Sequence, residues 1–129
     1  MDVDEIGVPM GSLLVHVTHG PEAPTRAALA VLVAKSAVDT GHQVVMFFAG
    51  DATNLLREVT ADTVQGIGTG SFGENLRALG QASVPIFASA MSAKARGVEG
   101  NLVGDLAVEF AMPTKLVELT MMSDRVLTY

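Results

Sequence analysis

The chain has 129 residues, of which 49% are hydrophobic and only 17% charged, with a net charge of −6 and a pI near 4.8. That length fits one domain over residues 1–129. Eight Lys and Arg residues against 14 Asp and Glu argue against a nucleic-acid partner, which would need a basic face. Because the chain has no cysteine, it can form no disulfide, thiolate nucleophile, persulfide or cysteine-ligated zinc site.

The low charge content also bears on partners and location. Charged residues make up about 25% of a typical globular domain, so the shortage predicts surface that lies against another subunit. No apolar run approaches the ~20 residues that a membrane span needs. The acidic start at residues 1–5 lacks the basic segment of a secretory signal. We therefore expect a cytoplasmic protein with no membrane partner.

The first half of the chain predicts two strands separated by a long helix. Residues 12–18 are apolar and β-branched, and residues 24–40 form an Ala- and Val-rich stretch that ends at a glycine. Residues 44–49 are continuously apolar, which is typical of a parallel strand buried on both faces. A short helix over 52–58 is expected next, with Asp51 as its N-cap.

The second half continues this alternation. Ser71 and Glu74 have the S-x-x-E spacing of a capping box, which predicts a helix to about residue 82. Residues 98–106 are ambiguous between loop and helix. The remaining expected elements are strands over 85–90, 106–111 and 125–129, a turn over 93–96 capped by Ser92, and a helix over 114–122. The alternation predicts an α/β three-layer sandwich with a mainly parallel sheet.

A glycine-rich loop over residues 66–73 superficially matches a dinucleotide-binding fingerprint. That fingerprint requires a buried strand before it, and residues 59–65 make a poor one. We interpret the loop as a flexible connection into a helix, with a flap over the site of a neighbouring subunit as the alternative. No cofactor is expected.

Four segments, read in order, resemble the DsrE/DsrF-like (YchN-like) family: VTHGP at 17–21, GHQV at 41–44, SAMSAKARG at 89–97 and SDRVLTY at 123–129. The resemblance covers nearly the whole chain. It implies a flavodoxin-like, five-stranded sheet of order 2-1-3-4-5 and assembly into trimers or hexamers. In sulfur-relay members the segment after the third strand carries a persulfide cysteine, and Ser89 lies nearest that place here. Because a hydroxyl forms no persulfide, the resemblance carries over the fold and not that activity.

Ligands of open α/β sheets bind beyond the carboxyl ends of the strands, near the point where the strand order reverses. This rule, together with the two cations that follow Ser92, gives a candidate ligand site of eight residues: His19, Gly20, Asp51, Ser89, Met91, Ser92, Lys94 and Arg96. The hydroxyl and two cations within residues 92–96 favour a small anion such as sulfate, phosphate or a carboxylate. Alternatively, Ser92 only caps the turn, while the cations make solvated or intersubunit contacts.

Histidine and methionine supply the remaining candidates. His16 and His19 lie three residues apart on a strand and would point to opposite faces, so no metal site is expected. His16 is interpreted as a hydrogen-bonded core histidine, and His19 as a candidate base with Asp51 as its partner. A Ser89-His19-Asp51 triad is disfavoured because Ser89 stands in Ala-Ser-Ala and not in a G-x-S-x-G elbow. Methionines near the C-terminal helix favour core packing or a subunit interface.

The sequence thus predicts a small homo-oligomeric protein, a trimer or hexamer, that binds a small anionic ligand or a protein partner and carries no persulfide. Two alternatives stay open. One is an enzyme that acts on a small metabolite with His19 or Asp51 as base. The other is a structural subunit that supports a cysteine-bearing paralogue of the same family.

Overall fold

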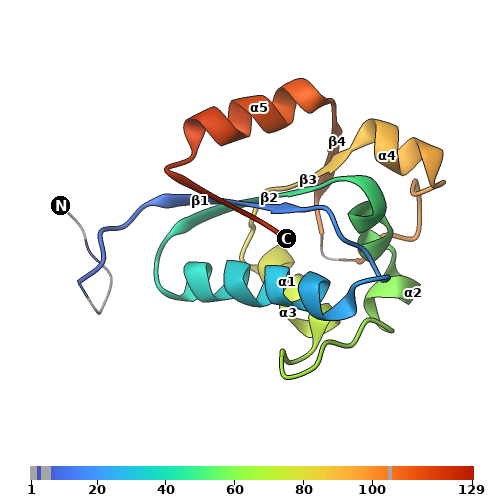
Figure 1. Ribbon diagram of the computed structural model, residues 1–129, viewed down its shortest axis with the longest axis horizontal. Helices are drawn as coiled ribbons and strands as arrows, with labels where there is room; N and C mark the ends of the chain where they lie inside the picture. The colour runs from blue at the N-terminus through green and yellow to red at the C-terminus, as the bar shows by residue number, and fades with distance from the viewer. Residues whose placement is uncertain (1–2, 4–6, 105) are drawn as a thin grey trace.

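Five parallel strands form one sheet with helices on both faces in the computed structural model, which describes residues 3, 7–104 and 106–129 (Figure 1). The strands are β1 (Ser12–Val17), β2 (Gln43–Phe48), β3 (Ile86–Ser89), β4 (Val108–Ala111) and β5 (Arg125–Thr128). The helices are α1 (Pro24–Asp39), the 3₁₀ helix η1 (Gly50–Leu56), α2 (Glu58–Ala61), α3 (Phe72–Gln81), α4 (Ala90–Ala95) and α5 (Pro113–Met122). The expected α/β class and the five strands are therefore confirmed, and every strand pair is parallel.

The predicted strand order was wrong. The sheet has the order β4-β3-β2-β1-β5, not 2-1-3-4-5. The predicted order would make β2 an edge strand, although its apolar run buries Val44, Met46, Phe47 and Phe48 and requires neighbours on both sides. In the observed order β2 is central, and the edges are β4 and β5, whose residues are largely exposed.

The observed order also changes the place in the sheet at which the direction of strand addition reverses. The chain runs from β1 through β2 and β3 to β4 in one direction, then returns across the sheet to place β5 on the other side of β1. The return crosses four strand spacings, roughly 19 Å, and the ten residues of α5 supply about 15 Å of it. The reversal therefore lies between β1 and β5.

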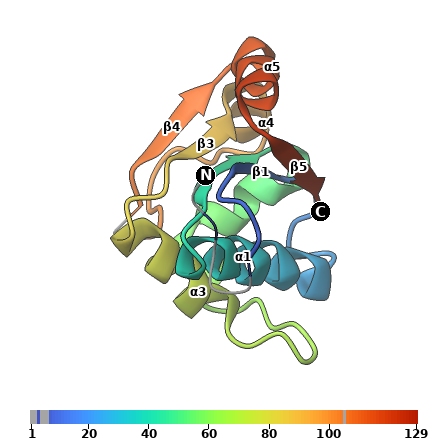
Figure 2. The same cartoon turned by 90° about the vertical axis from the view of Figure 1, so that its left-hand side faces the viewer.

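The two faces of the sheet are covered unequally. Figure 2 shows α1 and α3 together on one face, and α5 on the other. The α1 and α3 face holds most of the hydrophobic core, with α1 contributing Ala27, Ala30, Val31 and Ala34. Among the described residues, the buried cluster on the α5 face is smaller and consists of Leu14, Phe47 and Phe87. The sheet is thus tightly packed on one side and thinly covered on the other.

Two local expectations change at the carboxyl ends of the strands. Asp51 does not cap the helix that follows β2, because this segment is a 3₁₀ helix whose N-cap is Ala49. Ser89, and not Ser92, is the N-cap of α4. The capping box of α3 is formed as expected, since the Ser71 hydroxyl accepts from the Glu74 N–H.

The loops between these elements contain isolated bridges but little other regular structure. The ambiguous stretch 98–106 contains no helix or strand among its described residues, only an isolated bridge between Leu102 and Arg57. The glycine-rich loop is closed by a bridge between Gln65 and Ser71 and leaves Ile67 89% exposed. Within the described ranges, no helix has the length and apolar character to cross a membrane.

Candidate functional site

Residues from three strand ends meet at the carboxyl edge of the sheet. Gly20 follows β1 and packs so closely against the turn after β2 that a Cβ there would collide with the main-chain oxygen of Asp51. The Gly50 N–H in that turn donates to the hydroxyl of Ser92 in α4, at 2.9 Å. Parallel strands bring these segments together because their carboxyl ends share one edge. The fold therefore gathers Gly20, Asp51 and Ser92, as the candidate site requires.

The two serines of the site hold the backbone in place. Ser89 is 9% exposed, and its hydroxyl accepts from the Ser92 N–H at 3.1 Å. The Ser92 hydroxyl in turn accepts from Gly50. Ser89 lies nearest the place where sulfur-relay members of the resembled family carry a cysteine. In this chain its hydroxyl caps a helix.

The cations of the site differ in what they contact. Arg96 forms an ion pair with Asp51, with Nη2 to Oδ1 at 3.0 Å, and also donates from Nη1 to the Ser92 carbonyl oxygen at 3.1 Å. This pairing neutralises the charge that an anion would seek. Lys94 is exposed on α4, beside Met91, which is 60% exposed. Lys94 is thus the cation that this site presents to solvent.

His19 and Asp51 make separate contacts. The Nδ1 atom of His19 lies 3.3 Å from the Thr18 hydroxyl. That hydroxyl donates to the carbonyl oxygen of Tyr129 at 3.0 Å. Over the described residues, no hydrogen bond joins His19 to Asp51, whose carboxylate is held by Arg96. The arrangement does not form the base and partner pair considered from the sequence.

His16 is a polar side chain in an apolar place. It packs edge-to-face on Phe47 at 6.1 Å on the α5 side of the sheet. Its Nε2 atom is buried and has no hydrogen-bond partner, contrary to the interpretation of a hydrogen-bonded core histidine. Burial lowers the pKa of His16 from its usual value of 6.5, because the charged imidazolium is poorly solvated there. The described part of the chain contains no group of three or more His, Cys, Asp or Glu side chains placed to hold a metal ion.

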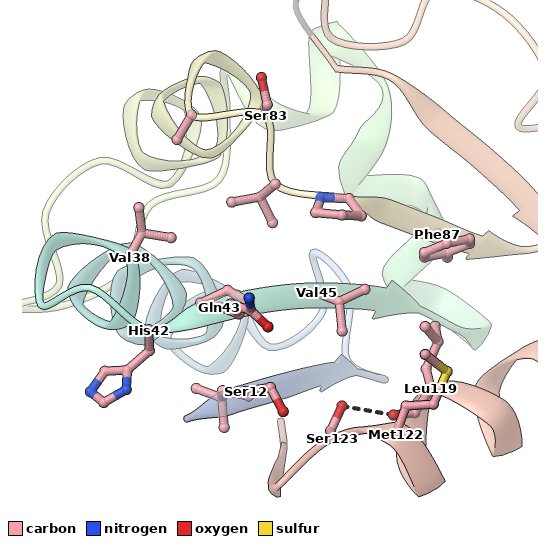
Figure 3. A pocket seen from close by; sticks show the side chains of 15 residues that line it. Ser12, Val38, His42, Gln43, Val45, Ser83, Phe87, Leu119, Met122 and Ser123 are labelled. Atoms are coloured by element: carbon pink, nitrogen blue, oxygen red, sulfur yellow. Dashed lines mark hydrogen bonds between the residues drawn. The ribbon is translucent and has the colours of Figure 1, made fainter. Parts of the chain in front are cut away.

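An apolar groove of about 530 Å³ lies at the amino ends of the strands and reaches both faces of the sheet (Figure 3). Val45 of β2, Phe87 of β3 and Leu119 and Met122 of α5 form much of its wall, with Gln43 at one side. The sequence did not indicate this groove, because its residues are scattered along the chain and form no motif.

A second cavity, of about 550 Å³, lies between the start of α1 and the end of β5. Arg26 and Leu29 of α1 face Thr128 and Tyr129 across it. None of these four residues was a candidate from the sequence. The corrected strand order is the signal that points to them, because it places the reversal beside β1 and β5.

The fold and this edge of the sheet define a small α/β protein with the YchN-like arrangement of strands. The chain belongs to the DsrE/DsrF-like family, whose model matches residues 11–129. The YchN protein of E. coli is structurally similar, with a TM-score of 0.76 and 19% identity over 93% of this chain and 100% of that one. MTH1491 of Methanobacterium thermoautotrophicum, a protein of unknown function, has a TM-score of 0.64 and 14% identity over 92% of this chain and 99% of that one. No match was found among curated proteins.

Proposed function

We propose that this protein works by non-covalent binding, as a subunit of a homo-oligomer that assembles through its α5 face. The family's sulfur-relay chemistry is closed to it because the chain has no cysteine to carry a persulfide. A trimer or hexamer, as the family resemblance implies, is the assembly we propose. The observation that carries the proposal is the exposure of α5.

Helix α5 is apolar in composition and yet contains no buried residue. Leu116 and Leu119 face the sheet and are partly buried. Val117, Met121 and Met122 are 60%, 81% and 78% exposed. Exposed apolar side chains that lie together are costly in water and typical of a surface that binds another protein.

The exposed surface continues from α5 onto the sheet. Met122 and Leu119 also line the apolar groove of Figure 3, which reaches Phe87 and Val45. Methionine side chains adapt readily to a partner surface. A second copy that covered α5 would therefore bury the helix and the groove together, which is the cover that this thinly packed face lacks.

Sedimentation velocity on two charge variants tests this proposal. Met121→Lys combined with Met122→Lys places two cations on the α5 face and should shift the protein to monomer. Val59→Lys is the matched control, because Val59 is 74% exposed on α2, away from α5. If the α5 variant sediments as the parent does, the proposed face is wrong. If only a cysteine-bearing relative binds and the parent is monomeric alone, the structural-subunit alternative replaces the homo-oligomer.

A small anionic ligand at the eight-residue site is the second candidate. It is supported by the convergence of Gly20, Ser89 and Ser92 and by the exposed Lys94. A thermal-shift titration with sulfate and phosphate tests it, since a ligand that binds only the folded state raises the melting temperature. The shift should disappear in Lys94→Ala, and its persistence there would contradict this candidate.

A further inference from the structure

The cavity between α1 and β5 lies at the point where the observed strand order reverses. Open parallel sheets bind ligands beyond the carboxyl ends of their strands, at the place where the order reverses. Here the order reverses between β1 and β5. The cavity lies at that end of β5, and its lining includes Pro24, Thr25, Arg26, Leu29, Thr128 and Tyr129.

The cavity wall formed by the end of β5 is fixed to β1 by main-chain hydrogen bonds. The Tyr129 N–H donates to the His16 carbonyl oxygen at 2.9 Å. The Tyr129 carbonyl oxygen accepts from the Thr18 N–H at 2.6 Å and from the Thr18 hydroxyl at 3.0 Å. Tyr129 also packs against the main hydrophobic core. The wall is therefore already formed without a ligand, which lowers the entropic cost of binding.

Among the described residues that line this cavity, the charged side chain is that of Arg26. In the described part of the chain, Arg26 has no carboxylate or hydrogen-bond partner, in contrast to Arg96, which is paired with Asp51. Glu22, the acidic residue nearest in sequence, instead accepts from the Gly20 N–H at 2.8 Å. The first turn of α1 contains no acidic residue. Arg26 is thus available to a carboxylate from outside the chain, which its guanidinium can bind in a bidentate manner.

The rest of the lining is suited to an apolar body. Leu29, Pro24 and Ala23 supply aliphatic surface. Tyr129 supplies an aromatic ring, and Thr128 adds a hydroxyl. A mostly apolar pocket with a few convergent polar groups is the usual form of a small-molecule site.

We propose that this cavity binds a small organic anion, with Arg26 pairing to its carboxylate and Leu29 and Tyr129 contacting its apolar body. The described residues that line this cavity do not belong to α5 or to the groove beside it. The cavity is also distinct from the site at Ser89, Ser92 and Lys94.

Benzoate is a suitable probe, and benzyl alcohol is its uncharged counterpart. Amide shifts in ¹H–¹⁵N spectra should change saturably on titration with benzoate, at residues 23–29 and 128–129. Benzyl alcohol should bind about three- to fivefold more weakly, because it cannot form the charged contact with Arg26.

Two matched variants separate the candidate sites. Because Arg26 is exposed, Arg26→Gln should weaken benzoate binding by about three- to fivefold, whereas Lys94→Gln should leave it unchanged. The Met121→Lys and Met122→Lys double variant should also bind benzoate normally. The proposal is overturned if benzoate causes no saturable change, if the changes centre on residues 89–96, or if Arg26→Gln binds benzoate as the parent does.

Discussion

Arg96 and Asp51 form an ion pair, with Nη2 of the guanidinium 3.0 Å from Oδ1 of the carboxylate, that links α4 to the turn after β2. Arg57 extends this link by donating from Nη2 to the Arg96 carbonyl oxygen at 2.6 Å. The sequence suggested that Arg96 binds an anion. In the structure its guanidinium instead connects the segments that follow two strands.

The ion pair should contribute little to stability, since its side chains are 32% and 56% exposed. We expect Asp51→Asn to lower the free energy of unfolding by no more than about 1 kcal/mol. Arg96→Ala should cost more, because it also removes the bond to the Ser92 carbonyl oxygen. Urea denaturation measures both, with the exposed Lys94→Ala as the control. A cost for Lys94→Ala equal to that for Arg96→Ala would contradict this assignment.

The Ser89 hydroxyl should act as a helix cap. Ser89→Ala should lower the free energy of unfolding by about 1 kcal/mol, because the Ser92 N–H loses its acceptor. Ser36→Ala is a matched control on the exposed face of α1, where the change should stay within about 0.5 kcal/mol. Equal effects of the two substitutions in chemical denaturation would argue against a capping role.

Gly20 is required by close packing. Gly20→Ala should destabilise the protein by about 1–3 kcal/mol, because the new methyl group meets the Asp51 main chain, which cannot easily move. Gly100→Ala is the control, since nothing lies within 4 Å of a Cβ at that position. Thermal unfolding of the two variants should differ clearly, and a Gly20→Ala melting temperature equal to that of the parent would show that the turn can relax.

His16 should make stability depend on pH. Because its pKa is lowered in the folded protein, the unfolded chain binds the proton more readily. The contribution of the neutral imidazole is therefore complete above the usual pKa of 6.5 and is lost as the pH falls through the lower folded value. His16→Leu should flatten the loss of stability on acidification, whereas Ser36→Ala, which changes no titratable group, should retain it. Denaturation midpoints measured at several pH values decide this, and a His16→Leu profile parallel to the parent's would refute it.

The sequence pattern was sufficient for the elements but not for their order. The continuous apolar run of β2, Pro24 at the start of α1 and the capping box at Ser71 are local signals, and each led to the right kind of element. Strand order depends instead on which face each helix covers, which no short segment encodes. The burial expected of β2 was the one available clue that it could not lie at an edge.

For the candidate site, the sequence predicted which segments lie together but not how their side chains pair. The rule on strand ends predicts that Gly20, Asp51, Ser89 and Ser92 lie near one another, and contacts do link their segments, because parallel strands place their carboxyl ends together. Whether they form a ligand site stays a prediction. The pairing of Arg96 with Asp51 could not be read from the sequence, since 45 residues separate them. The cavity beside Arg26 depends on strand order and was missed with it.

The measurement that tests the central proposal most directly is light scattering of the parent protein over a dilution series in the micromolar range. Assembly through the α5 face predicts a mass that is a multiple of 13.4 kDa and falls only on strong dilution. A mass near 13.4 kDa at every concentration would mean that this exposed apolar face binds no second copy, and the proposed assembly would be wrong.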